Sequence, residues 1–315
     1  MLRYSIALIL FAAGTLSPAQ TLEIPDFKVT VDVELVQLPV SVVDKQGLPY
    51  RGLEQGHFAV YEDKVLQDIS LFKQEDIPLS VGLVIDASDS MLDKRDRLNT
   101  AAMTFVRESN PEDETSIVSF GTEVFLEQEF TRDTGVLNRS LARINSGGDT
   151  ALYDAVLLAA NYLQRNGSRD KKVLLVVTDG EDNKSKYALK EALKVVAESK
   201  VIVYTVGLLN SGLYTYAPSR DTAKDALKQL AEVTGGVAFF PKNVNDVQKV
   251  CVRIARDLRS QYTIGYRPLN QNLDGAWRKV QVRLSPPKNA PSLKVRTKQG
   301  YYAPRKSEPL LDSKK

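Results

Sequence analysis

The sequence predicts an α/β protein with a doubly wound, mostly parallel sheet of six strands, helices on both faces of that sheet, and a small β-sandwich-like unit. The first observation is that short apolar runs alternate with helix-like stretches between residues 80 and 258. The second is that the flanks of this region have β character, with the period-two alternation of half-buried strands. The third is that 315 residues with 43% hydrophobic content suffice for a large and a smaller packed unit.

The central region begins with residues 81–85, an apolar run of the kind that is buried on both faces of a parallel sheet. Further strands are expected at 115–120, 123–130, 172–177, 201–206 and 237–240. Helices are expected at 98–106, 152–163, 187–197, 221–233 and 244–258, where apolar residues recur at helical spacing. Because parallel strands need crossover connections, this alternation predicts the doubly wound sheet.

The two flanks are expected to build the β unit together. On the N-terminal side, residues 29–35 alternate between apolar and polar side chains, and Pro39 fits a strand start or an edge position. The expected strands that follow are 40–43, 58–61 and 69–72, and those of the C-terminal side are 261–267, 277–284 and 293–297. Either flank alone has too few strands to bury a stable core, so we expect them to pair; two separate β units are the alternative.

The N-terminus has the pattern of an export signal. Arg3 precedes a short apolar run, and small residues suited to cleavage end at Ala19. The run is shorter than the ~20 residues needed to cross a bilayer, so we expect cleavage near Ala19 and a secreted, periplasmic or cell-envelope protein; an uncleaved membrane anchor is the alternative. No later segment is apolar for long enough to span a membrane.

These patterns divide the chain into five expected segments. They are a signal peptide at 1–19, an N-terminal β module at 20–78, the α/β domain at 79–260, a C-terminal β segment at 261–303 and a disordered tail at 304–315. The tail is charged and contains proline, a composition that does not form a packed core.

The composition narrows the classes of function. The 42 basic and 39 acidic residues are interspersed, so no extended positive field for nucleic acid is expected. The single cysteine, Cys251, lies among apolar neighbours and is expected to be a small buried thiol on a helix. The single histidine, His57, is expected in a loop or at a strand edge. This inventory nearly excludes His/Cys zinc sites, Ser-His-Asp triads and Cys-His pairs.

Three polar clusters lie at expected strand ends or helix starts. DASDS at 86–90 follows the first central strand, GGDT at 147–150 precedes a helix, and TDGE at 178–181 follows the strand at 172–177. Each alone also fits a capped turn. Ligands of open parallel sheets collect at the carboxyl ends of the strands, so we expect the three clusters to form one site at one edge of the sheet.

These clusters offer carboxylates and hydroxyls but neither imidazole nor thiolate. An all-oxygen donor set suits a hard cation, Mg²⁺ above all, with Ca²⁺ or Mn²⁺ as alternatives. Mg²⁺ takes six oxygens at about 2.1 Å and usually keeps waters, so three hydroxyls and two carboxylates would leave at least one position open. Through that position the metal could take part in function.

The clusters resemble the metal ion-dependent adhesion site of von Willebrand factor type A domains, including those of integrins. The resemblance covers roughly residues 79–260 and rests on five positions in sequence order: Asp86, Ser88, Ser90, Thr150 and Asp179. The flanking sequence also resembles bacterial secreted proteins called von Willebrand factor A-related. The segments concerned are TALYDA at 150–155, which contains Asp154, QYTIGYR at 261–267 and RTKQGYY at 296–302.

The resemblance implies a role for each residue. Ser88 and Ser90 would bind the metal directly, and Thr150 directly or through water. Asp86 and Asp179 would act largely through water and hydrogen bonds. The open position would take a Glu or Asp carboxylate of a partner protein. In integrin-type domains the metal site is coupled to movement of the last helix, which here would be residues 244–258.

The charge of the expected site also favours a carboxylate at the open position. Only two carboxylates face the ion, and hydroxyls add no charge, so a third carboxylate would be favoured. Asp149 departs from the family pattern, because many relatives have Gly or Thr there. It could lower the preference for an acidic ligand or raise the affinity for the cation, and both remain open. Asp89, between the serines, is expected to point into solvent.

We therefore expect an exported protein-binding module of the adhesion type that recognises an acidic group through a divalent cation, and not an enzyme. One alternative is a structural scaffold of an envelope or surface assembly with a non-essential metal site. The other is a metal-assisted hydrolase, for which no general base stands out. Haloacid-dehalogenase-type enzymes need a second Asp two residues after the first, where this chain has Ser88.

Overall fold

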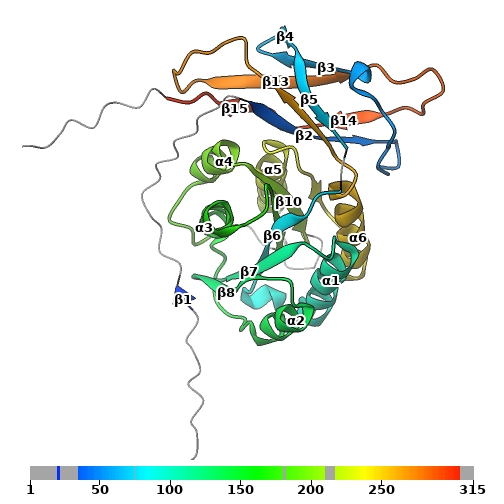
Figure 1. The fold of residues 1–315 in the computed structure, drawn as a ribbon. Coiled ribbons are helices and arrows are strands. Elements are labelled where there is room, and N and C mark those ends of the chain that lie inside the picture. The colour runs from blue at the N-terminus through cyan, green and yellow to red at the C-terminus, as the bar shows by residue number, and fades with distance from the viewer. Residues whose placement is uncertain (1–19, 22–34, 75, 180–181, 210–216, 306–315) are drawn as a thin grey trace, which may run out of the picture.

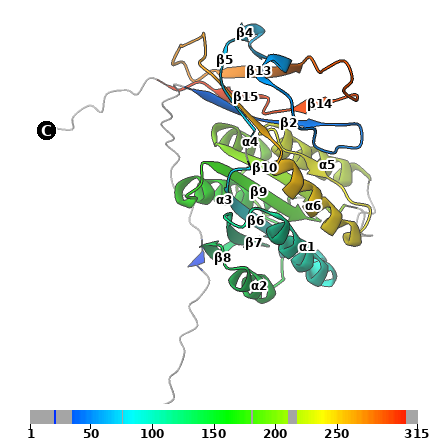
Figure 2. The ribbon, with the colours of Figure 1, turned by 45° about the vertical axis from the view of Figure 1, so that its right-hand side comes forward.

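The computed structural model describes residues 20–21, 35–74, 76–179, 182–209 and 217–305 (Figure 1). The expected signal peptide, the alternating segment up to residue 34, positions 180–181 of the third polar cluster and nearly all of the expected disordered tail lie outside these ranges. Within the ranges, no helix is long and apolar enough to cross a membrane. Figures 1 and 2 show an α/β unit with two antiparallel sheets beside it.

The α/β unit contains the six predicted strands in the order β8-β7-β6-β9-β10-β11, with the two-residue β1 paired along the outer edge of β8. All neighbours from β7 to β11 run parallel. β8 is antiparallel to β7 because the two follow each other through a tight turn. The strands are β1 (Gln20–Thr21), β6 (Leu79–Asp86), β7 (Glu114–Phe120), β8 (Val124–Thr131), β9 (Lys171–Thr178), β10 (Val201–Gly207) and β11 (Ala238–Phe239).

Helices cover both faces of this sheet, as predicted. One buried cluster joins the sheet to α1, α2 and α6, and a second joins it to α3, α4 and α5. The helices are α1 (Arg95–Glu108), α2 (Thr134–Arg143), α3 (Leu152–Asn166), α4 (Leu189–Glu198), α5 (Ala217–Glu232) and α6 (Val247–Leu258). α2 was not predicted from the sequence. It begins after Asp133, whose carboxylate accepts hydrogen bonds from the amides of Gly135 and Val136 at 2.7 and 3.0 Å.

The two flanks form a β sandwich, and both sheets combine strands from the two flanks. Their orders are β14-β2-β12-β5 and β15-β13-β3-β4. The apolar core between them includes Leu38, Val60 and Ile264, none of which is exposed. The predicted pairing of the flanks is therefore confirmed. The strands are β2 (Val36–Val43), β3 (Phe58–Glu62), β4 (Val65–Gln67), β5 (Ile69–Lys73), β12 (Tyr262–Tyr266), β13 (Trp277–Leu284), β14 (Lys294–Arg296) and β15 (Gly300–Tyr302).

Pro39 lies in the middle of β2 and pairs with Thr263 of β12, so the prediction that it begins a strand is wrong. β14, on the other side of β2, pairs only with residues 41–43. At Pro39 the strand therefore has one partner in the described part of the sheet, which is the local edge that a residue without an amide hydrogen needs. The predicted edge position is correct.

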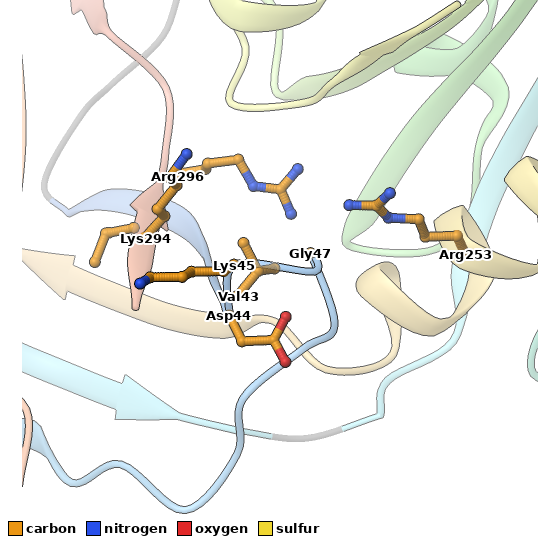
Figure 3. A pocket seen from close by; sticks show the side chains of 8 residues that line it. Val43, Asp44, Lys45, Gly47, Arg253, Lys294 and Arg296 are labelled. Atoms are coloured by element: carbon orange, nitrogen blue, oxygen red, sulfur yellow. The ribbon is translucent and has the colours of Figure 1, made fainter. Parts of the chain in front are cut away.

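The sandwich meets the α/β unit beside α6. The turn after β2 reaches this helix, and Figure 3 shows Gly47 of that turn near Arg253 of α6. At the carboxyl end of the same helix, the Leu258 carbonyl accepts a 2.8 Å hydrogen bond from the ammonium of Lys171, the first residue of β9. Because β9 begins here, the sandwich lies at the end of the sheet opposite to the carboxyl ends of the parallel strands.

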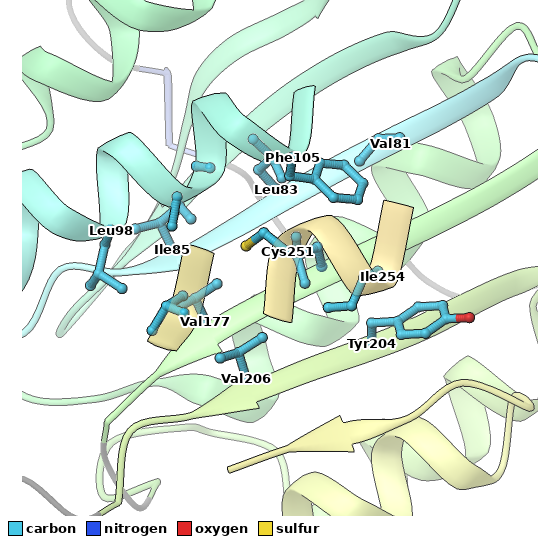
Figure 4. Packing of buried hydrophobic residues seen from close by; sticks show 14 of the residues in the cluster. Val81, Leu83, Ile85, Leu98, Phe105, Val177, Tyr204, Val206, Cys251 and Ile254 are labelled. Carbon is cyan, nitrogen blue, oxygen red and sulfur yellow. The ribbon is translucent and has the colours of Figure 1, made fainter. Parts of the chain in front are cut away.

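Cys251 is 1% exposed on α6, where Figure 4 shows it between the helix and the sheet, as predicted for a buried thiol. Its neighbours in this cluster include Leu83 and Phe105. Burial raises the pKa of the Cys251 thiol to about 12, so the reactive thiolate is strongly disfavoured. The cysteine is part of the packed core.

The buried carboxylate of Glu62 joins three strands of the sandwich. Its Oε2 accepts hydrogen bonds from the hydroxyls of Tyr266 and Tyr301 at 2.7 and 2.8 Å. We expect Tyr266→Phe to lower the free energy of unfolding by about 1.5–3 kcal/mol, measured by urea denaturation, because a hydrogen bond to a buried charged group is lost. The control is Tyr61→Phe on β3, the strand of Glu62. The Tyr61 ring lies under the Arg283 guanidinium, and we expect this variant to change the free energy of unfolding by less than about 0.5 kcal/mol. Equal losses in both variants would contradict this role for Glu62.

Candidate functional site

The first two polar clusters meet at the carboxyl end of β6. The amide of Gly147 donates to the Ala87 carbonyl at 2.7 Å, and the amide of Asp89 donates to the Gly148 carbonyl at 3.4 Å. Gly121, after β7, makes this approach possible, because a Cβ there would lie 2.6 Å from the Gly147 carbonyl oxygen. The loops at 86–90 and 147–150 are thus held together by their backbones.

Asp86 is 1% exposed and orients the first loop from the end of β6. Its Oδ1 accepts a hydrogen bond from the amide of Ser88 at 2.9 Å, and its Oδ2 accepts one from the hydroxyl of Thr178 at 2.5 Å. Burial raises the pKa of the Asp86 carboxyl, and the nearby Asp179 carboxylate raises it further. A cation bound beside Asp86 would favour its ionised form.

Ser88 and Ser90 connect the first loop to the third cluster. Their hydroxyl oxygens are 3.1 Å apart, and the Ser90 hydroxyl donates to Asp179 Oδ1 at 2.7 Å. Asp179 follows β9 and is 3% exposed. Four of the five predicted metal-site residues therefore belong to one hydrogen-bonded group.

Thr150, the fifth predicted residue, is held beside this group by its backbone. Its amide donates to Asn183 Oδ1 at 2.8 Å, and its carbonyl accepts from the Asn183 amide at 3.0 Å. The side chain is buried. In the described part of the chain, no hydrogen bond joins its hydroxyl to the other four residues. Asn183, which sequence analysis missed, ties the second loop to the third; only the tertiary structure shows this pairing.

Lys94 is a second residue that sequence analysis missed. It ends the 3₁₀ helix η2 (Asp89–Lys94), and its ammonium contacts Asp179 Oδ2 and donates to the Ser90 carbonyl at 2.9 Å. The side chain is 13% exposed. Its position four residues after Ser90, one helical turn away, is the signal that could have placed it near the site. The chain thus brings its own cation to a carboxylate that the predicted metal would approach.

The other acidic residues near the loops have separate partners. Asp149 is half exposed, and its Oδ2 lies 3.5 Å from the ammonium of Lys184. Asp89 is exposed, as expected. Asp154 of α3 is buried and accepts hydrogen bonds from the amides of Lys186 and Tyr187 at 3.0 and 3.1 Å, which holds the loop after the third cluster against α3.

The chemistry of the cluster fits a hard divalent cation. The described residues contain no group of three or more His, Cys, Asp and Glu side chains that could hold a metal ion, so a metal here would depend on the hydroxyls as well. Asp86 and Asp179, when ionised, carry two negative charges against the single positive charge of Lys94. Carboxylate and hydroxyl oxygens around a net negative charge suit Mg²⁺, Ca²⁺ or Mn²⁺.

Comparison with known proteins agrees with this architecture. The model of the von Willebrand factor type A domain family matches residues 81–181, which include all five predicted metal-site residues. Calcium-activated chloride channel regulator 1 of Mus musculus is 27% identical over 168 residues, 51% of this chain and 17% of that protein. The Equus caballus protein of the same name gives the same values. The match therefore spans less than a fifth of the length of these relatives.

The fold is also similar to that of a solved structure. It is a von Willebrand factor type A protein from Catenulispora acidiphila, with a TM-score of 0.50, 10% sequence identity, and coverage of 88% of this chain and 76% of that one. The family match begins in β6 and ends just after Asp179, so it contains the centre of the sheet and all three polar clusters. The α/β unit of this chain is a von Willebrand factor type A domain.

Proposed function

We propose that this chain is an exported protein-binding module that recognises an acidic group of a partner protein through a divalent cation, in the first instance Mg²⁺. The observation that carries the proposal is the hydrogen-bonded group of two buried carboxylates and two serine hydroxyls at the carboxyl ends of β6 and β9. Domains of this type are commonly adhesion or protein-binding modules. The proposed ligand set is Asp86, Ser88, Ser90, Thr150 and Asp179.

The charge of the proposed site favours an acidic partner. Hydroxyl ligands leave most of the charge of a divalent ion uncompensated, and Lys94 already offsets part of the charge of Asp179. A carboxylate from outside would supply the missing negative charge. Leu92, 57% exposed on η2 two residues from Ser90, offers an apolar contact next to that carboxylate. This combination suits a protein surface that presents Asp or Glu.

Export is the part of the proposal that rests on sequence alone. The pattern that supports it is the short apolar run after Arg3 with small residues up to Ala19, which lies outside the described ranges. We also propose that the chain is not an enzyme. Its single histidine, the usual general base, lies in η1 (Gln55–His57) of the sandwich and not among the polar clusters.

A structural scaffold is the second candidate function, and one observation favours it. The Lys94 ammonium contacts Asp179, so an internal cation stabilises this carboxylate without a metal. In that case the loops would be held together by the ion pair and the metal would be dispensable.

Metal titration by calorimetry separates the two candidates. We expect Mg²⁺ or Mn²⁺ to bind the wild-type chain, and Ser88→Ala with Thr150→Ala to weaken that binding at least about tenfold, because two proposed oxygen ligands are lost. The control is Thr100→Ala with Thr104→Ala on α1, whose hydroxyls donate to carbonyls of their own helix. The Thr104 hydroxyl also accepts from Gln248 of α6, and neither threonine belongs to the polar clusters. Unchanged metal affinity in the Ser88/Thr150 variant would contradict the proposed ligand set.

The same pair of variants tests the partner. Affinity capture from envelope and culture-medium extracts should retain a protein in Mg²⁺, lose it in EDTA, and lose it with the Ser88/Thr150 variant but not with the α1 control. A partner that survives both EDTA and the substitutions would favour the scaffold function.

A further inference from the structure

A cleft of about 440 Å³ lies where α6 meets the β sandwich (Figure 3). Its lining carries four basic side chains, Lys45, Arg253, Lys294 and Arg296, and one acidic side chain, Asp44. The size lies within the range of small-molecule sites. The cleft is on the sandwich side of the α/β unit, away from the polar clusters at the carboxyl ends of the strands.

Arg253 of α6 is held in place on two sides. Its guanidinium lies over the ring of Phe239, 5.4 Å from the ring centroid. On the other side it packs against Gly47, where a Cβ would lie 1.5 Å from Nη2. Gly47 has a φ of +78°, so glycine is suited both to the turn and to the space that the guanidinium takes. Arg253 is therefore a preorganised donor.

Arg296 of β14 is fixed by a different contact. Its Nη2 donates to Oδ1 of the buried Asp257 at 2.9 Å, and Asp257 Oδ2 accepts a hydrogen bond from Tyr204. The Nε of Arg296 is buried and so is not open to the cleft, whereas its Nη1 makes no hydrogen bond within the described ranges. Figure 3 shows the guanidinium of Arg296 directed toward Arg253 across the cleft. Part of its donor capacity is thus unused.

The charges of the lining are not balanced. Asp44 Oδ1 accepts a 2.8 Å hydrogen bond from the amide of Leu48, so this carboxylate is engaged in its own turn. Among the described residues, no ion pair involves Lys45, Lys294 or Arg253. Basic groups gathered on one concave surface repel one another, and a bound anion would relieve that repulsion.

We propose that this cleft binds a phosphate-type oxyanion, either free or carried on a small molecule. Two guanidinium groups from opposite walls present planar sets of donors that match phosphate oxygens, and the two lysines add point charges. The proposal is independent of the metal site, because the cleft shares no residue with it.

The test uses inorganic phosphate as the probe, titrated by calorimetry into the full chain at constant ionic strength, with chloride as the reference anion. Arg253→Met keeps an apolar side chain against Phe239 and removes the charge, and we expect it to weaken phosphate binding at least about tenfold. The matched control is Arg256→Met, an exposed arginine on the same helix that does not line the cleft; its phosphate affinity should equal that of the wild type.

Further arms keep the test decisive. If Arg253→Met fails to fold, Lys294→Gln on the opposite wall takes its place in the test. It should also weaken phosphate binding. Glycerol phosphate binding more tightly than phosphate would indicate an oxyanion on a small molecule, and the reverse order would indicate the free ion. Mg²⁺ binding should be unchanged in Arg253→Met. No phosphate binding to the wild type at millimolar concentration, or equal affinity in the Arg253 and Arg256 variants, would overturn the proposal.

Discussion

Lys94→Met is expected to raise the affinity of the candidate site for Mg²⁺ about tenfold to hundredfold. In the wild-type chain a divalent ion must displace an ammonium that contacts Asp179 Oδ2 and donates to the Ser90 carbonyl. Breaking a hydrogen-bonded contact to a charged group costs about 1.5–3 kcal/mol, and each 1.4 kcal/mol corresponds to a factor of ten in affinity. Methionine fills a similar volume without the charge.

Two measurements distinguish this role from a purely structural one. Calorimetric titration with Mg²⁺ should show the tighter binding, and the metal-free variant should have a lower Tm than the metal-free wild type, because Asp179 loses its counter-charge. The control is Lys184→Met, which removes a half-exposed lysine paired with Asp149, and which should change both quantities little. Lower or equal Mg²⁺ affinity in Lys94→Met would show that the ammonium does not compete with the metal.

Asp86→Ala is expected to abolish Mg²⁺ binding and to lower the free energy of unfolding by about 2–4 kcal/mol. The substitution removes the acceptor of two buried donors, the Ser88 amide and the Thr178 hydroxyl, each with a cost of about 1–3 kcal/mol. Relief of the buried carboxyl, whose pKa is raised by burial, offsets part of that cost. The loop that carries both serines would lose its anchor to β9.

Asp86→Asn separates the charge from the shape. The amide keeps one acceptor oxygen and similar volume, so most of the stability should remain, whereas Mg²⁺ affinity should still fall by at least about a hundredfold. Urea unfolding in EDTA measures the first quantity and calorimetry the second. Asp149→Ala, which removes a half-exposed carboxylate on the neighbouring loop, is the control and should affect stability little. Wild-type Mg²⁺ affinity in both Asp86 variants would remove Asp86 from the proposed site.

Long apolar runs and long amphipathic helices were predictable because periodicity reports directly on which face is buried. All strands of the central sheet with clear apolar runs and five of its six helices were expected, each within a few residues of its observed bounds. The missed strands β4 and β15 have only three residues each, too few for a clear period. α2 does have an apolar face, with Leu137 and Leu141 buried, but it is only ten residues long and contains Thr, Gly and Asn, which are weak helix formers.

The candidate site also contains some residues that the sequence could predict and others that it could not. The five oxygen-bearing residues could be chosen as candidates because two of their loops follow parallel strands, whose carboxyl ends share one edge of the sheet, and the third directly precedes α3. Spacing could have placed Lys94 near Ser90, but its contact with Asp179 depends on the direction of the side chain. Asn183 could not be assigned, because its role depends on a pairing of two loops that sequence spacing leaves open. The basic cleft was likewise invisible, since Arg253 and Lys294 are distant in sequence and meet only where the sandwich contacts α6.

By itself, the sequence determined that this protein has a doubly wound sheet, that its flanks are β-rich, and that the loops after β6 and β9 carry carboxylate and hydroxyl side chains. These properties follow from local patterns, because burial has a period in each type of element. Only the tertiary structure decided that both sandwich sheets mix the two flanks, that an ammonium contacts Asp179, and that two arginines face each other beside α6. Those features arise from contacts between distant segments, whose geometry is set by packing and not by spacing along the chain.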